Sequence, residues 1–350
     1  MDFASDNAAG VAPAVLEAIL GANPGFALGY GNDDLTRALE RRMSALFECE
    51  LAVFLVATGT AANALALAHL TPPWGGVLCH AEAHIAIDEC GAPEFFGGGI
   101  KLIGLPGAGA KLSPATLSAA IARHSGHRPH AVQARALSLS QVTEAGTVYT
   151  VEEIRALATM AHASGLSVHM DGARFANALA RLGASPAAMS WQAGVDALSF
   201  GATKGGALAA EAVVIFDPKA ADAMHERRKR GGHLVSKHRF LAAQFAAFLA
   251  DDNWLAWASH ANRMAARLAH GLAAHRLAPV WPVEANLVFV VLPAATDARL
   301  RAAGARYYAR ASQSLPDGIA IQDGDVLARL VTSFATTEAE IERFVTVAAG

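Results

Sequence analysis

The sequence predicts an α/β protein in which a mostly parallel sheet is covered by helices on both faces. Two observations carry this prediction. Short apolar runs alternate with longer helical stretches up to residue 216, a pattern typical of parallel strands joined by crossover helices. With 53% hydrophobic and 17% charged residues over 350 positions, the chain also has enough apolar material for one large or two packed domains.

Seven strands are expected in this first part, each a short apolar run bounded by glycine, proline or polar residues. They are placed at 51–56, 76–79, 100–104, 136–140, 166–170, 196–200 and 211–216. Ser113 before Pro114 marks a helix start, because serine caps free amides and proline presets the first helical dihedral angle. Thr150 with Glu153 forms a capping box for a helix that extends to about residue 164.

The chain changes character after residue 216. Long helical stretches are expected at 218–230, 238–251 and 254–276, and an apolar strand follows at 287–292. Thr337 with Glu340 marks the last helix. We therefore predict a large domain over 1–245, which includes the N-terminal segment, and a smaller C-terminal α+β domain over 246–350.

Charge argues against two classes of function. The chain holds 28 basic and 31 acidic residues, and this net charge of −3 disfavours charge-driven binding to nucleic acids or membranes. The uncharged run 51–70 has the length of a membrane span. Polar residues in its middle, however, favour a strand, a turn and a helix: Thr58, Gly59, Thr60 and Asn63.

Cysteine usage indicates a reducing compartment. Cys49, Cys79 and Cys90 are odd in number and widely spaced, and they form no paired zinc or redox motif. The chain opens without a basic segment followed by an apolar one, so no secretory signal is expected. These features predict a cytoplasmic protein.

The turn Thr58-Gly59-Thr60 is a candidate phosphate site. It lies between an apolar strand and a helix-forming run, so its amides and hydroxyls would lie at a helix N-terminus, where anions are stabilised. A tight turn with a simple cap explains the same residues. The turn matches neither the Walker pattern nor the dinucleotide fingerprint.

Two charged residues have the positions expected of catalytic groups. Asp171 follows an apolar strand at its carboxyl end, where open α/β sheets bind ligands; a helix cap paired with Arg174 is the alternative. Lys204 is the only charged residue between 197 and 210. Desolvation there would lower the pKa of its amine and favour a Schiff-base lysine, although a lysine that extends from a glycine-rich loop into water fits too.

His80, Glu82 and His84 do not have the spacing of a zinc-protease helix, so we expect no metal there. His84 is better interpreted as a titratable ring near a cofactor, with a buried structural histidine as the alternative. A basic run at 227–230 is either a solvated face or a contact to a phosphate or a neighbouring subunit.

The chain resembles the pyridoxal-phosphate enzymes of the aspartate aminotransferase fold in the order of three features: a phosphate-binding turn, a strand-end aspartate and then a lysine. The resemblance narrows to the threonine aldolase family, in its bacterial low-specificity L-threonine aldolase and phenylserine aldolase branch. It covers nearly the whole chain. The segments that carry it are Phe3–Asn7, Tyr30-Gly31 with Asp33, Thr58–Asn63, His84 through Pro93, His169–Arg174, Thr203-Lys204 and Arg329–Thr332.

The resemblance implies a role for each matched residue. Lys204 would bind the aldehyde of pyridoxal 5'-phosphate, Asp171 would pair with the pyridine nitrogen, and His84 would stack on the ring. Gly59 and Thr60, with Thr203 close by, would bind the phosphate. Three residues would hold the substrate carboxylate, for which guanidinium groups are well suited: Ser5, Arg174 and Arg329. Tyr30 would reach the site from a neighbouring subunit.

Two departures from the family pattern leave roles open. Many relatives carry Glu-Asn-Thr-His where this chain has Gln141-Val-Thr143-Glu144. The base that acts on the β-hydroxyl is therefore His84, directly or through a water, or Glu144. The family arginine that reaches a neighbour's phosphate is absent at its usual place, and Lys237 or Lys229 is the candidate to replace it.

The implied reaction is retro-aldol cleavage of a β-hydroxy-α-amino acid to glycine and an aldehyde, with threonine yielding acetaldehyde. A β-eliminating lyase, an aminotransferase or a catalytically silent homologue on the same scaffold is the alternative, because the cofactor apparatus alone does not fix which bond breaks. The cross-subunit site implies a homo-oligomer, at least a dimer, and tetramers are common among relatives.

Overall fold

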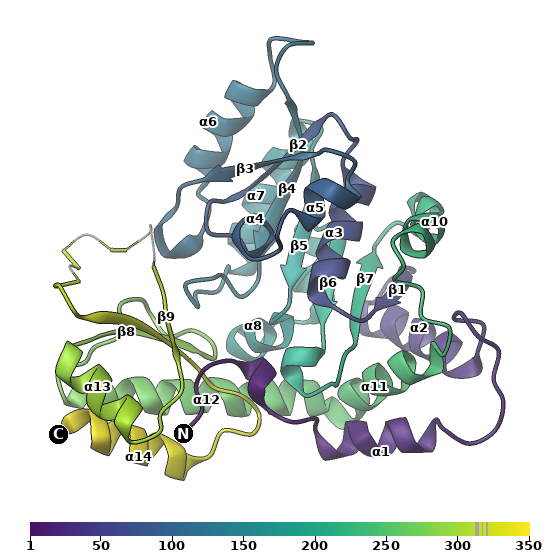
Figure 1. Ribbon diagram of the computed structural model, residues 1–350. Helices are drawn as coiled ribbons and strands as arrows, with labels where there is room; N and C mark the ends of the chain where they lie inside the picture. Colours follow the sequence, from purple (N-terminus) through teal and green to yellow (C-terminus); the bar gives the residue numbers. More distant parts are fainter. Residues whose placement is uncertain (312–314, 317, 320) are drawn as a thin grey trace.

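The computed structural model describes residues 1–350 except 312–314, 317 and 320. Its main feature is a seven-stranded sheet with the order β1-β7-β6-β5-β4-β2-β3 (Figure 1). The strands are β1 Ala52–Val56, β2 Gly75–His80, β3 Lys101–Leu105, β4 Gln133–Ser140, β5 Ser167–Gly172, β6 Ala197–Gly201 and β7 Glu211–Ile215. All seven predicted strands are confirmed to within a few residues.

The sheet is mostly parallel, as predicted, but β7 runs antiparallel to both of its neighbours, β1 and β6. The reason is the short connection between β6 and β7, because a parallel crossover needs a dozen or more residues. A single 3-10 turn, η4 (Thr203–Gly205), occupies this connection. Lys204 is therefore held in a tight turn directly after a fully buried strand.

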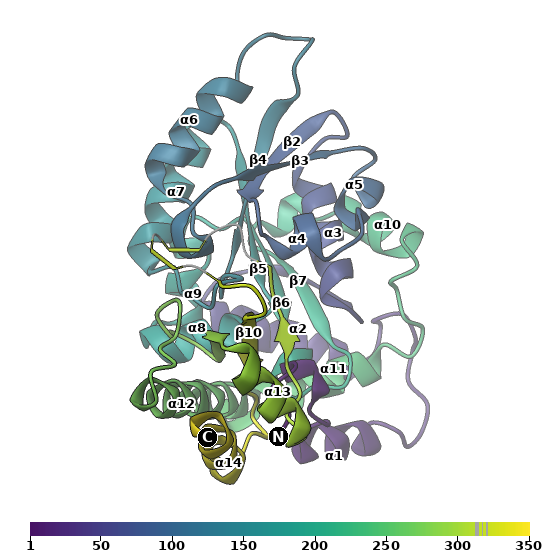
Figure 2. The same ribbon diagram turned by 60° about the vertical axis from the view of Figure 1, so that its left-hand side comes forward.

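Helices cover both faces of the sheet (Figures 1 and 2). Central strands β5 and β6 are buried nearly throughout, which explains their continuous apolar sequences. The covering helices are α2 Asp34–Phe47, α3 Gly59–Leu70, α6 Pro114–His124, α7 Val151–Ala163, α8 Phe175–Leu182, α10 Ala223–Arg230 and α11 Arg239–Leu249. The predicted serine cap of α6 and the capping box of α7 are both present.

A second sheet lies in the C-terminal part, with the order β8-β10-β9 and antiparallel pairing throughout. Its own apolar cluster includes Leu268, Val288, Leu330 and Phe344, and Phe3 of the N-terminal segment packs into it. The elements are α12 Asn253–Ala274, β8 Leu287–Leu292, α13 Ala294–Ala302, β9 Tyr308–Ala309, β10 Val326–Val331 and α14 Glu338–Ala349. The predicted domain boundary near residue 246 stays a prediction.

The remaining short elements are η1 Asp6–Ala8, α1 Pro13–Gly21, α4 His84–Ile87, α5 Ala92–Phe96, η2 Ala108–Ala110, α9 Pro186–Met189, η3 Trp191–Ala193, η5 Pro218–Ala220 and η6 Ala250–Asp252. The helix predicted at 218–230 is divided into η5 and α10, because the Asp217 side chain caps a separate first turn. Among the described helices, none combines the length and apolar character needed to cross a bilayer.

Candidate active site

A cavity of about 490 Å³ opens at the carboxyl ends of the central strands, where open α/β sheets bind ligands. Residues of the C-terminal part line its other side. Eight of the residues predicted for the site line this cavity: Ser5, Gly59, His84, Glu144, Asp171, Arg174, Lys204 and Arg329. The chain thus brings together groups that lie far apart in the sequence.

Asp171 ends strand β5 as a buried carboxylate. One oxygen accepts a hydrogen bond from the Ala173 amide at 3.0 Å and the other from the Asn63 amide group at 2.9 Å. Burial alone would raise the pKa of Asp171, but the positive charges of His84 and Lys204 outweigh burial and hold the pKa below its ordinary value. Asp171 is therefore ionised at neutral pH.

Lys204 lies in the η4 turn with its amine removed from water. Burial and the nearby Arg174 guanidinium lower the pKa of Lys204 below its ordinary value, and Asp6 and Asp171 only partly oppose them. The lowered pKa raises the fraction of neutral amine, the form that attacks a carbonyl carbon.

Helix α3 directs its N-terminus at the cavity. The Thr58 hydroxyl caps the helix by accepting a hydrogen bond from the Ala61 amide at 3.1 Å, and the first helical amides have no partner within the helix. Gly59 lines the cavity, and a β-carbon at this position would meet open space. Thr60 follows in the same helical turn, so this end of α3 offers free amides to an anion.

His84 belongs to a hydrogen-bonded chain that reaches Asp171. Its Nδ1 lies 2.8 Å from Glu89 Oε1, and the Asn63 amide group donates to the same oxygen at 2.8 Å as well as to Asp171. The Glu89 side chain has no exposed surface. The hydrogen bond to Glu89 raises the pKa of His84. Neither Asn63 nor Glu89 stands out in the sequence as a site residue, although both lie in segments that carry the family resemblance.

In the described part of the chain, one cluster of side chains has the spacing of a cation site. Ligand atoms of His84, Glu89 and Asp171 all lie within 4.8 Å of one another. The Asn63 amide group already donates to both carboxylates, so hydrogen bonds hold this cluster together. His80, by contrast, accepts from the Glu82 amide and contacts the Gly107 carbonyl oxygen at 3.0 Å, which are structural contacts.

Two arginines bring positive charge to the substrate side. Asp6 holds Arg174 through two hydrogen bonds of 2.7 and 3.0 Å, and Asn286 donates to the same carboxylate. Arg329 donates to the Ala4 carbonyl oxygen at 3.4 Å. Burial lowers the pKa of Arg329 to about 10, which leaves its guanidinium charged at neutral pH. Ser5 caps the η1 turn at the cavity, and Asp6 is a further residue that sequence reasoning missed.

Glu144 has one bonded and one free carboxylate oxygen. Oε1 accepts from the His84 amide at 2.9 Å and from the Ser140 hydroxyl at 2.8 Å. Oε2 is buried and has no hydrogen-bond partner among the described residues. Burial raises the pKa of Glu144, against the effect of those two hydrogen bonds.

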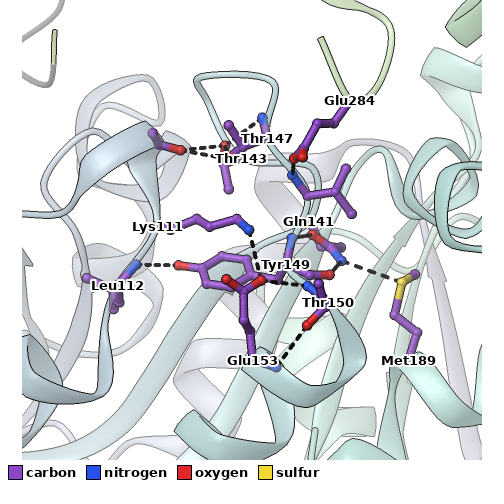
Figure 3. A network of polar contacts seen from close by, with 12 residues as sticks. Lys111, Leu112, Gln141, Thr143, Thr147, Tyr149, Thr150, Glu153, Met189 and Glu284 are labelled. Carbon is purple, nitrogen blue, oxygen red and sulfur yellow. Dashed lines mark hydrogen bonds and ion pairs between the residues drawn. The ribbon is translucent and has the colours of Figure 1, made fainter. Parts of the chain in front are cut away.

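The segment that carries Glu144 is held firmly (Figure 3). Gln141 and Tyr149 exchange two hydrogen bonds of 2.8 and 3.0 Å across the segment. Between them, Thr143 and Thr147 are joined by their hydroxyl groups at 2.8 Å. These contacts fix the position of Glu144 before any ligand binds.

Five predicted residues are not among those that line the cavity of their own chain: Tyr30, Thr60, Thr203, Lys229 and Lys237. Tyr30 is about half exposed, and the Lys229 amine lies 5.0 Å from the centre of its ring. Within the basic run, Arg228 is buried against the Phe54 ring, whereas Lys229 and Arg230 are exposed. A contribution of Tyr30 and a lysine to a neighbouring subunit's site stays a prediction.

The donor set of this cavity fits pyridoxal 5'-phosphate. A buried amine of lowered pKa can bind the aldehyde, an ionised carboxylate can bind the pyridinium nitrogen, and free helix amides beside open space at Gly59 can bind the phosphate. Thr203 precedes the lysine in the same turn.

Comparison with known proteins identifies the family of the chain. Residues 2–295 match the family model described as beta-eliminating lyase. The low specificity L-threonine aldolase of Pseudomonas aeruginosa is 44% identical over 87% of this chain and 88% of its own.

Two solved structures are also similar. A Leishmania major threonine aldolase superimposes with a TM-score of 0.91 at 29% identity, over 99% of this chain and 98% of its own. A structure of SPT with PLP, 17% identical, shares the fold with a TM-score of 0.72 over 100% of this chain and 86% of that one. The chain therefore belongs to the beta-eliminating lyase family and, within it, to the low-specificity L-threonine aldolases.

Proposed function

We propose that this protein cleaves the Cα–Cβ bond of L-threonine, L-allo-threonine and related β-hydroxy-α-amino acids, releasing glycine and an aldehyde. It is a carbon–carbon lyase, and its cofactor is pyridoxal 5'-phosphate. The observation that carries the proposal is the joint placement of Lys204, Asp171 and two arginines around one cavity. The similarity to the Pseudomonas aeruginosa aldolase identifies the class of reaction.

When bound, the cofactor supplies an aldehyde for amines and a ring that accepts the electron pair of the broken bond. Lys204 holds it covalently, and its lowered pKa favours the reactive neutral amine. Asp171 stays ionised and holds a proton at the pyridine nitrogen, which keeps the ring electron-poor. Gly59 and Thr60 at the start of α3 bind the phosphate, with Thr203 beside them.

Ser5, Arg174 and Arg329 hold the carboxylate of the substrate. Asp6 occupies two nitrogen atoms of Arg174, so this guanidinium is fixed before substrate binds. Holding the carboxylate sets the rotation about the Cα–nitrogen bond and thereby selects which bond at Cα breaks. Glu89 raises the pKa of His84, which favours the protonated ring and so a positive charge near Asp171.

In our proposal, a homo-oligomer completes this site. The oligomer is at least a dimer, and its full form is a tetramer. Large apolar side chains are exposed, among them Leu20, Phe26, Leu28, Tyr30 and Leu208. Such side chains are typical of buried interfaces. Tyr30, with Lys229 or Lys237, would then contact the cofactor phosphate of the adjacent subunit.

The free cysteines of the chain support a cytoplasmic location.

The test is a product balance with threonine as substrate. The cofactor-loaded protein is incubated with each of the four threonine stereoisomers and with phenylserine, and glycine, aldehyde and ammonia are quantified. We expect glycine and aldehyde in equal amounts from the L-isomers. Release of ammonia with a 2-oxo acid would support β-elimination instead. Transfer of nitrogen to an added 2-oxo acid would support an aminotransferase, and the absence of turnover would support a catalytically silent homologue.

A further inference from the structure

We propose that Glu144 is the catalytic residue that takes the proton from the β-hydroxyl of the substrate. This inference rests on the proposed function and assigns its proton acceptor. It follows from one feature of the cavity wall: on a residue that lines the cavity, Glu144 Oε2 is a buried carboxylate oxygen without a partner in the described part of the chain.

The Glu144 carboxylate is held in one orientation by its other oxygen. The His84 amide and the Ser140 hydroxyl both donate to Oε1, so the Glu144 side chain cannot rotate without losing both hydrogen bonds. The backbone carbonyl oxygen of Glu144 also accepts from Arg310 at 2.9 Å. A buried polar atom that is left unpaired costs free energy, and such atoms in native proteins often serve a ligand.

His84 is less suited to accept the proton. Its Nδ1 contacts the Glu89 carboxylate at 2.8 Å, and this contact favours the protonated ring, which has no free electron pair. Glu89 also has an unpartnered Oε2. However, Glu89 shares the Asn63 amide group with Asp171, so it belongs to the end of the cavity that binds the pyridine nitrogen.

Glu144 by contrast lies beside the C-terminal part of the chain. Arg310, which donates to its carbonyl oxygen, is among the charges that influence Arg329 at the carboxylate site. Glu144 is therefore the unpaired carboxylate on the substrate side. Its position also coincides with the departure from the family pattern, where relatives carry a histidine.

The proton balance of the step is simple. Ionised Glu144 takes the hydroxyl proton at Oε2, the O–H electron pair becomes the second bond of the aldehyde carbonyl, and the Cα–Cβ bond breaks with its electron pair left on the Cα side. Glu144 then loses the proton to water in the open cavity. The Cα carbon takes one proton from water through a different group, so the net change is cleavage to glycine and aldehyde.

The step requires the ionised form of Glu144, so the cleavage rate should rise with pH as this carboxyl group ionises. Burial raises the pKa of Glu144 toward the working pH. The titratable and charged groups around it are His84, Asp171, Arg310, Cys79 and Tyr149. Among these, the backbone amide of His84, which donates to Oε1, favours the ionised carboxylate, and the charge of Asp171 opposes it.

The test compares two reactions in Glu144→Gln holoenzyme. Glutamine keeps the shape and can accept both hydrogen bonds at Oε1, but it cannot take a proton. Threonine cleavage is measured alongside exchange of the glycine α-proton in D₂O, followed by NMR, which involves no β-oxygen. We expect cleavage to fall at least about 100-fold, while glycine exchange and the absorbance of the bound cofactor stay within about threefold of wild type.

Glu94→Gln is the matched control, because Glu94 also has a buried oxygen without a partner but does not line the cavity. It should cleave like wild type. Ser140→Ala removes one hydrogen bond to Oε1 and should move the rise in cleavage rate to higher pH. An equal loss of cleavage and exchange in Glu144→Gln, or unchanged cleavage, overturns the assignment. If wild type itself yields no aldehyde, the proposed function fails instead.

Discussion

The two ends of the cavity differ in how their polar groups are connected to one another, although buried oxygens without a partner among the described residues occur at both ends: Asn63 Oδ1 and Glu89 Oε2 at one, and Glu144 Oε2 at the other. At the Asp171 end, Asn63 and Glu89 connect the carboxylate to His84 through hydrogen bonds of 2.8 to 2.9 Å. At the other end, Glu144 leaves an oxygen unpaired, and Arg329 makes one long contact of 3.4 Å. The hydrogen-bonded chain at the Asp171 end preorganises that end for a resident cofactor, and the other end keeps polar groups for a substrate that binds and leaves.

The two ends also have different origins. The cofactor end is formed by strand ends and by helix α3 of the large sheet. The substrate end combines the N-terminal Ser5, the β10 residue Arg329 and the segment after β4. Substitutions at the first end should therefore affect the chemistry most. At the second end, substitutions of Ser5 and Arg329 should affect substrate binding, and Glu144, as the proposed proton acceptor, is the exception.

The largest effect is expected for Asp171→Asn. The neutral amide cannot hold a proton at the pyridine nitrogen, so kcat/KM for threonine cleavage should fall about 1,000-fold, the size of effect seen when a preorganised electrostatic group is removed. Asp196→Asn is the control, because Asp196 bonds His162 and the Val168 amide before β6 begins, away from the cavity. Near-wild-type activity of Asp171→Asn would remove Asp171 from the cofactor site.

An intermediate effect is expected for Arg329→Leu. Loss of a hydrogen bond to a charged group costs about 1.5 to 3 kcal/mol, which corresponds to a rise in KM of about 10- to 100-fold. The Michaelis constant for threonine and the dissociation constant of glycine should rise together, with little change in kcat. Arg329→Lys should recover part of the affinity. An unchanged KM would show that another group holds the carboxylate.

The smallest effect is expected for Glu89→Gln, with kcat at neutral pH within about tenfold of wild type. Without the Glu89 carboxylate, the pKa of His84 should fall from its raised value. Our account requires protonated His84. As the pH rises, Glu89→Gln should therefore lose activity at a lower pH than wild type does. NMR titration of the His84 ring and a pH profile check this prediction. An unaltered titration would contradict the coupling.

Asp171 and Lys204, which line one cavity, could be singled out from the sequence, but the hydrogen bonds around them could not. Asp171 and Lys204 stand out because a lone charge after an apolar strand has few structural explanations. Asn63 and Glu89 do not stand out, since only folding brings α3 beside α4 and β5. The antiparallel β7 was missed because an apolar run does not reveal strand direction. Asp6 was missed because its partner Arg174 lies far along the chain.

The central claim is the covalent role of Lys204, and peptide mapping tests it directly. The cofactor-loaded protein is reduced with borohydride, digested and analysed by mass spectrometry. Our account predicts one phosphopyridoxyl group per chain, attached to Lys204. Attachment to another lysine, or a reducible adduct that persists in Lys204→Ala, would contradict it.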